Sequence, residues 1–239
     1  MRKTIERLEK AAAELHISLT DTQKEHFIRY YELLIEWNKE VNLTNITKPE
    51  EVIDKHFIDS LSIIKVIDLK DQKLIDIGTG AGFPGIPIKI VFPETQIVLL
   101  DSLQKRVTFL ETVIHELGLE DIKAVHGRAE DLAKTLEYRE IFDICVSRAV
   151  ANLAVLSEFC IPFVREGGDF ISYKAETASE EIEEAKKAID LLGGKYEKTV
   201  SMKLPFTEYG RNLILIHKCG TTNSKYPRKA GIPIKRPLV

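Results

Sequence analysis

The stretch LIDIGTGAGFPG, residues 74–85, decides the fold class. A short apolar run carries the acid Asp76, and the glycines Gly78, Gly80 and Gly82 then follow at every second position. Glycines after a strand permit a tight turn and let a ligand approach the backbone closely. The stretch therefore predicts a strand, a ligand-binding loop and the start of a helix.

Strands and helices are expected to alternate after this loop. β-rich runs lie at 73–77, 96–100, 122–126, 142–147, 168–173, 196–204 and 212–218, and helical stretches lie at 85–92, 103–118, 129–136, 153–164 and 179–192. Such alternation predicts a mostly parallel sheet with helices on both faces. No helical stretch separates the last two runs, so they can pair as an antiparallel hairpin. We expect a Rossmann-like α/β fold of six parallel strands plus one reversed edge strand, the last in the chain.

Residues 1–70 are expected to be helical. Apolar residues at steps of three and four over 21–42 place one stripe on one helix face. Thr20 and Gln23 have the spacing of a capping box at the start of that helix. A second helix is expected over 50–66, with a proline in its first turn.

The composition excludes several classes of protein. The chain has 239 residues, a net charge of −3 and 44% hydrophobic residues, enough for a large core. No apolar run approaches the roughly 18 residues of a membrane helix, and the charged N-terminus does not resemble a signal peptide. The three cysteines and six histidines lack the spacing of disulfide or metal sites. We expect a cytoplasmic monomer without a metal or membrane contact.

The charge is unevenly distributed along the chain. Residues 221–239 hold five basic residues and no acid, so the rest of the chain has a net charge of −8. Such a tail can meet a phosphate backbone, or it can be solvated and disordered. We therefore expect a helical extension at 1–70, a cofactor-binding domain at 71–220 and a basic tail at 221–239.

The spacing of the glycines favours S-adenosylmethionine over a dinucleotide. A dinucleotide fingerprint is G-x-G-x-x-G, whereas this loop is G-x-G-x-G with Asp76 two residues before it. S-adenosylmethionine carries an ammonium and a sulfonium, which suit a carboxylate neighbour. Asp101, after the second expected strand, can accept hydrogen bonds from ribose hydroxyls of either cofactor, or it can cap a helix. Ala129 and Glu130 follow the third expected strand, where the adenine lies in such folds.

The loop after the fourth expected strand bears on the methyl acceptor. Its Ser147-Arg148-Ala149 lacks the Pro-Pro-Tyr of enzymes that methylate exocyclic amines and the Pro-Cys of covalent attack. The acceptor is then an atom that is already nucleophilic, such as guanine N7, for which positioning and electrostatics suffice. Arg128, Arg148 and Arg211, at strand ends, can hold phosphate or guanine. The alternatives are that Arg128 pairs with Glu130 and that Arg211 is an exposed loop residue.

The whole chain resembles the bacterial 16S rRNA (guanine-N7) methyltransferases, also called the glucose-inhibited division protein B family. The resemblance rests on WNK at 37–39, NLT at 42–44, HF at 56–57, DSL at 59–61, the glycine loop through residue 87, DS at 101–102, KR at 105–106, FL at 109–110, SRA at 147–149 and RNL at 211–213.

The resemblance implies transfer of a methyl group from S-adenosylmethionine to a guanine of 16S rRNA, numbered 527 in the 530 loop, in naked RNA, a small subunit or an assembly intermediate. It implies that Gly78 and Phe83 line the methionine end of the cofactor and that Arg148 lies near the reacting centre. It gives Arg128 and Arg211 a role with the substrate. It also makes other basic residues candidate RNA contacts, namely Lys174, Lys225 and Arg228. A small-molecule methyltransferase stays open as the alternative.

Overall fold

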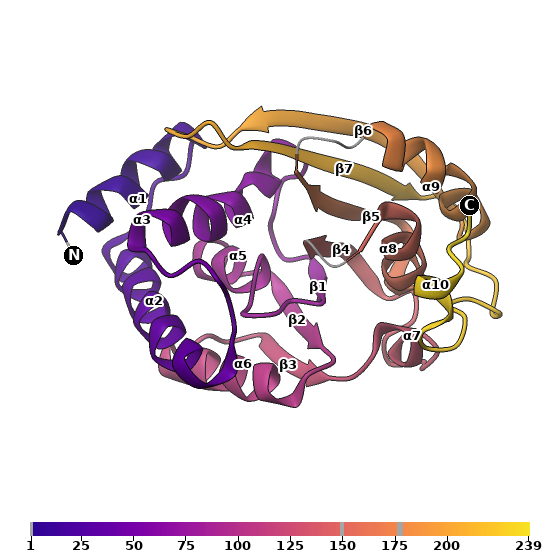
Figure 1. Ribbon diagram of the computed structural model, residues 1–239, viewed down its shortest axis with the longest axis horizontal. Coiled ribbons are helices and arrows are strands. Elements are labelled where there is room, and N and C mark those ends of the chain that lie inside the picture. The colour runs from indigo at the N-terminus through magenta and orange to yellow at the C-terminus, as the bar shows by residue number, and fades with distance from the viewer. Residues whose placement is uncertain (1, 149–150, 176–178) are drawn as a thin grey trace.

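The computed structural model describes residues 2–148, 151–175 and 179–239 (Figure 1). A sheet of seven strands crosses the molecule in the order β3-β2-β1-β4-β5-β7-β6. The strands are β1 (Lys73–Ile77), β2 (Gln96–Asp101), β3 (Ile122–His126), β4 (Phe142–Arg148), β5 (Val164–Lys174), β6 (Gly194–Lys203) and β7 (Gly210–Lys218). All seven expected strands form, which confirms the α/β Rossmann-like class.

The position of the reversed strand differs from the expectation. β7 is antiparallel to both β5 and β6 and lies between them, so the edge strands are β3 and β6. The expected antiparallel pairing of β6 and β7 is confirmed. The expectation that the reversed strand lies at the edge of the sheet was wrong. β7 holds a continuous buried run, Leu213 to Ile216, which fits an interior strand covered on both faces. β6 is largely polar and half-exposed, which suits an edge.

Helices cover both faces of the sheet, and successive strand residues point to opposite cores. One core joins Leu74, Ile97 and Ile144 to the first helices of the chain. The other joins Ile75, Cys145 and the later helices, so Cys145 is a core residue. The first face carries α1 (Arg2–Glu14), α2 (Asp21–Val41), α5 (Gly85–Val91) and α6 (Gln104–Glu116), and the second carries α7 (Ala129–Leu132), α8 (Leu153–Cys160), α9 (Ser179–Leu191) and α10 (Ile232–Lys235).

The N-terminal helices share the core of the sheet. Thr20 caps α2 through the expected capping box with Gln23. Phe27 and Tyr30 on α2 are buried against Phe57. The division of the chain at residues 70 and 220 stays a prediction. One continuous core crosses the first of these boundaries, so residues of the N-terminal segment pack together with residues of the sheet. No helix in the described part of the chain is both long and apolar enough to span a membrane.

The segment expected as one helix over 50–66 is a composite. α3 (Pro49–Val52) runs into a π-helix (Ile53–Ile58), then α4 (Asp59–Leu61) and a 3-10 turn (Ser62–Lys65). A π-helix bonds i to i+5, is rare, and occurs frequently at functional sites. This wider turn carries His56 and brings Asp59 to the same side of the molecule as the strand ends. Apolar periodicity does not reveal it, because all these turns have similar periods.

Two further helices are shorter than expected. α7 ends at Leu132 instead of 136, and α8 ends at Cys160, where a 3-10 turn with Pro162 leads into β5. The basic tail is packed on the protein, with Tyr226 and Pro233 buried, and α10 lies beside α7 and α8 (Figure 1).

Candidate active site

The side chain of Asp76 holds the glycine loop through two hydrogen bonds. Its carboxylate is fully buried, and Oδ2 accepts hydrogen bonds from the Thr79 hydroxyl at 2.7 Å and the Gly85 N–H at 2.9 Å. The other oxygen, Oδ1, is buried without a partner among the described residues. Burial raises the pKa of Asp76 to about 7, against the opposing effect of these two hydrogen bonds. A positive charge held at the loop would therefore stabilise the ionised carboxylate.

All three loop glycines have a backbone conformation that favours glycine, and Gly82 is in addition closely packed. Gly78, Gly80 and Gly82 all have positive φ, between 62° and 96°, which favours glycine. At Gly82 a Cβ would also lie 2.5 Å from Ile86 Cδ1 on α5 and 2.8 Å from the Tyr30 hydroxyl on α2, so the loop packs closely against both helices there. The Tyr30 hydroxyl donates to the Ala81 carbonyl and fixes the loop on that helix.

Asp101 holds the other side of the loop. Its Oδ2 accepts from the Gly80 N–H at 2.9 Å, and its Oδ1 accepts from the Leu103 N–H at 2.9 Å. The Arg106 guanidinium lies 3.4 Å from Oδ2. Each carboxylate oxygen has a second lone pair, so Asp101 keeps acceptor capacity for the hydroxyls of a ribose.

A cavity of about 210 Å³ opens beside these groups. Its wall is apolar at Ile77, Leu100 and Phe159, and it carries the carboxylate of Asp101. The wall is completed by Gly78, Ser102, Gly127, Arg128, Ala129, Glu130 and Ile234. Apolar faces with a carboxylate at one end fit a nucleoside, whose base is flat and whose sugar donates hydrogen bonds.

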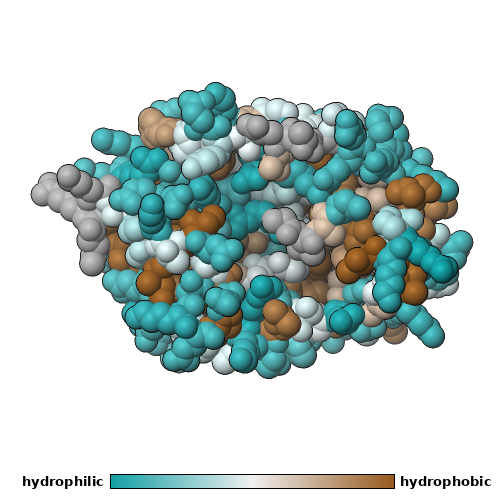
Figure 2. Space-filling view, in the orientation of Figure 1, coloured by the Kyte–Doolittle hydropathy of each residue, from teal (hydrophilic) through white to brown (hydrophobic). Residues whose placement is uncertain are grey.

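A second, wider cavity of about 850 Å³ lies on the side of the glycine loop that faces α4. It is lined mainly by charged and aromatic residues, namely Lys55, His56, Asp59, Arg148, Tyr173, Lys174, Glu181, Glu208, Tyr209 and Arg211. Figure 2 shows hydrophilic side chains around a hollow on this face. The reversal of β7 explains how Arg211 reaches it, because the beginning of β7 lies at the same sheet edge as the ends of β4 and β5.

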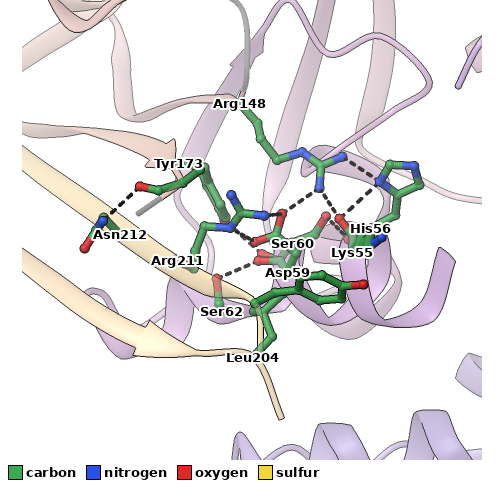
Figure 3. Close-up of polar contacts among 12 residues, drawn as sticks. Lys55, His56, Asp59, Ser60, Ser62, Arg148, Tyr173, Leu204, Arg211 and Asn212 are labelled. Carbon is green, nitrogen blue, oxygen red and sulfur yellow. Dashed lines mark hydrogen bonds and ion pairs between the residues drawn. The ribbon is translucent and has the colours of Figure 1, made fainter. Parts of the chain in front are cut away.

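Asp59 joins two arginines at the base of this cavity (Figure 3). Arg211 donates to Oδ1 at 2.5 Å and to Oδ2 at 3.0 Å, and Arg148 donates to Oδ2 at 2.8 Å. Asp59 is fully buried, whereas the two guanidinium side chains keep 12% and 17% of their exposure. Two positive charges around one negative charge leave the cluster with a net charge of +1 facing the cavity. Such a cluster attracts a phosphate or the acceptor edge of guanine.

His56 is neutral in this cluster. Burial, and then the charge of Arg148, lower the pKa of His56 to about 3. The Arg148 Nη2 lies 3.2 Å from Nδ1. The Lys55 carbonyl oxygen also lies 3.1 Å from Nδ1, and Nε2 lies 2.9 Å from the Thr44 hydroxyl, so both ring nitrogens have polar partners. His56 thus contacts Arg148 as an uncharged ring at neutral pH.

Phe83, at the end of the glycine loop, contacts the arginine cluster. Its ring stacks on His56 with centroids 4.4 Å apart, and the Arg148 guanidinium lies 5.1 Å from the ring centroid. The ring is almost wholly buried. The loop and the cluster are therefore packed into one rigid unit.

The remaining predicted site residues are dispersed. Arg128 is exposed at the first cavity and makes no ion pair with Glu130 among the described residues. The Lys174 ammonium donates to the Ala151 carbonyl and pairs with Glu181, both at 2.7 Å. In the tail, the Lys225 ammonium lies over the Tyr226 ring, and Arg228 pairs with Glu158. Ala149 lies outside the described residues, and no metal-binding cluster of acids, histidines or cysteines occurs in the described ranges.

Asp59 and His56 were missed as members of the site. A signal was present, since HFIDSL places an acid within an otherwise apolar helical run. A buried carboxylate needs partners. Lys55, four residues earlier, is a local candidate in the sequence, but in the structure it pairs with Glu51. The sequence could thus indicate that Asp59 needs a cationic partner, but not which one.

The sheet order, the glycine loop and the adjacent cavities define a Rossmann-like methyltransferase fold. Solved structures with this fold include precorrin-6y C5,15-methyltransferase from Geobacter metallireducens, with 15% identity, a TM-score of 0.51 and coverage of 72% of this chain and 90% of that one. M. jannaschii TYW2 in complex with AdoMet has 14% identity, a TM-score of 0.52 and coverage of 67% and 74%.

The family is defined by closer relatives. The family model for GidB, rRNA small subunit methyltransferase G, matches residues 23–213, and the chain belongs to this family. It is 51% identical to ribosomal RNA small subunit methyltransferase G of Clostridium tetani over 97% of each chain. It is 53% identical to that of Lachnoclostridium phytofermentans over 94% of this chain and 93% of the relative. The resemblance expected from the sequence is confirmed.

Proposed function

We propose that the protein transfers a methyl group from S-adenosylmethionine to N7 of guanine 527 in 16S rRNA, in the cytoplasm. The observation that carries the proposal is a pair of cavities, the first lined by Gly78 of the glycine loop and the second by His56 and Arg148, which pack on Phe83 of that loop. One suits a nucleoside, and the other has the net positive arginine cluster around Asp59. The family names of the relatives support ribosomal RNA as the substrate.

The first cavity would hold the cofactor. Asp101 is oriented to accept from the ribose hydroxyls, and the backbone of Ala129 and Glu130 would meet the adenine. Gly78 lets the cofactor approach the loop. The buried oxygen of Asp76 that lacks a partner supports a cationic ligand, since a nearby ammonium would stabilise the carboxylate.

The second cavity would hold the guanine. When bound, S-adenosylmethionine supplies an electrophilic methyl group, which the lone pair of N7 can attack without loss of a proton. Arg148 and Arg211 can donate to guanine O6 and to phosphate, which leaves N7 free. A guanidinium on N7 itself would block the reaction. Neutral His56, held against Phe83, fixes the direction of Arg148.

Other cations would contact the RNA backbone. Arg128 is exposed beside the first cavity, and Lys174 lies at the rim of the second. We propose Arg128 for a phosphate contact, whereas Lys174 stays a predicted RNA contact whose ammonium already pairs with Glu181. Lys225 is exposed on the tail and stays a predicted RNA contact, whereas the guanidinium of Arg228 is already held by Glu158.

The test is methyl transfer to defined RNA. The purified protein is incubated with methyl-labelled S-adenosylmethionine and small subunits or naked 16S rRNA from cells that lack this modification. We expect label on one guanine, at N7. Label in no RNA would refute the proposal, and label in a small molecule of an RNA-free extract would support the small-molecule alternative.

A further inference from the structure

The basic tail is attached to the body by a buried ion pair. Glu158 on α8 is fully buried, and it accepts from the backbone N–H of Arg228 at 2.7 Å and from its guanidinium at 2.6 to 3.1 Å. A buried carboxylate is costly unless such donors surround it. The tail therefore supplies a partner that the body needs, and Arg228 is not available to a polyanion.

Two further contacts fix the path of the tail. Arg139 donates to the carbonyls of Thr222 at 2.7 Å and Tyr226 at 3.0 Å, and the Tyr226 side chain is buried. Beyond Arg228, the Gly231 N–H donates to Glu130 Oε1 at 3.1 Å. Glu130 begins α7 and lines the first cavity, so this bond ties the tail directly to the predicted cofactor site.

These anchors place Ile234 at the mouth of the first cavity. Ile234 lies on α10, beside α7 and α8 (Figure 1), and lines the cavity together with Phe159 and Ala129. Ile234 is 64% exposed, so most of its apolar surface faces solvent at the cavity. A ligand in the cavity would cover part of this apolar surface.

We propose that Ile234 forms the outer wall of the adenine end of the cofactor cavity, so that the C-terminal tail is a cofactor-binding element. The inference rests on the proposed function for the identity of the cofactor. The adenine ring would lie between apolar side chains of the body, such as Ile77 and Leu100, and Ile234 of the tail. Apolar side chains on both faces of the adenine ring would remove those faces from water, which favours binding.

Ile234→Ala tests the proposal in the full chain. The change removes three carbons, and partial covering of those carbons by the ligand corresponds to an increase in Kd of about five-fold. The matched control is Ile232→Ala, which removes the same atoms from the same short helix at a residue outside the cavity lining. Binding is measured by calorimetry with S-adenosylhomocysteine and, separately, with 5′-methylthioadenosine, which lacks the amino acid.

The proposal predicts the same loss for both ligands in Ile234→Ala and less than a two-fold change in Ile232→Ala. Equal affinities of wild type and Ile234→Ala would overturn it, and so would a loss seen with S-adenosylhomocysteine alone, because the contact is assigned to the adenine end. A loss of RNA affinity with unchanged ligand affinity would make the tail an RNA arm and also overturn it. Failure of wild type to bind either ligand would instead refute the proposed function.

Discussion

Replacement of Asp59 by asparagine tests the arginine cluster most directly. The change keeps the shape of the side chain but removes the negative charge that holds Arg148 and Arg211 together. An amide oxygen can still accept one or two of the three hydrogen bonds. We expect turnover to fall, because the two guanidiniums would repel each other and leave their positions at the cavity.

The magnitude follows from the burial of the three groups. Breaking a fully buried ion pair costs about 3–5 kcal/mol, but both arginines keep a little solvent contact, so we expect about 2 kcal/mol. For a chain of this length that corresponds to a decrease in Tm of about 4–8 °C. A displacement of about 1 Å in a positioning group can cost about a hundred-fold in rate. The first cavity does not include Asp59, so the Kd for S-adenosylmethionine should change less than about two-fold.

The matched control is Asp54→Asn. Asp54 lies on the π-helix that directly precedes Asp59, and it forms a bidentate pair with Arg7, at 2.6 and 2.9 Å, outside both cavities. It should lower Tm without lowering the methylation rate at a temperature where the variant is folded. Thermal unfolding, calorimetry and labelled methyl transfer are measured on both variants. A rate in Asp59→Asn equal to that of the control, or a cofactor Kd that rises as far as the rate falls, would refute the reasoning.

Three other predictions concern the loop and Arg148. The affinity for S-adenosylmethionine should fall up to about ten-fold from pH 7.5 to 6, because a carboxyl with a pKa of about 7 becomes neutral and no longer attracts a cation; Asp76→Asn should remove this dependence in calorimetric titrations. Gly82→Ala should lower the free energy of unfolding by about 3 kcal/mol, because its Cβ would overlap the Ile86 side chain and the Tyr30 hydroxyl at a positive φ. Gly80→Ala should cost about 1 kcal/mol, since space is open there, and equal urea midpoints would contradict this. Arg148→Ala should lower the methylation rate at least about thirty-fold while the cofactor Kd changes less than three-fold, and an unchanged rate would remove Arg148 from the site.

Most strands and helices could be predicted from the sequence, because each depends on the apolar pattern within its own segment. The period-2 and period-3.6 patterns predict all seven strands and the main helices within a few residues, since each element buries its own apolar face. The glycine loop was readable for the same reason, because Asp76 and its hydrogen-bond partners lie within nine residues of one another.

The site itself depends on contacts that no local pattern contains. Arg148 and Arg211 reach Asp59 across 89 and 152 residues, and Gly231 reaches Glu130 across 101. Their positions follow from the insertion of β7 between β5 and β6, and from the π-helix that carries His56. Sequence alone therefore determined which segments form strands, helices and the glycine loop, because burial of an apolar face is settled within each segment. Only the tertiary structure decided which charges meet, because a buried charge is satisfied by whichever partner the topology brings to it.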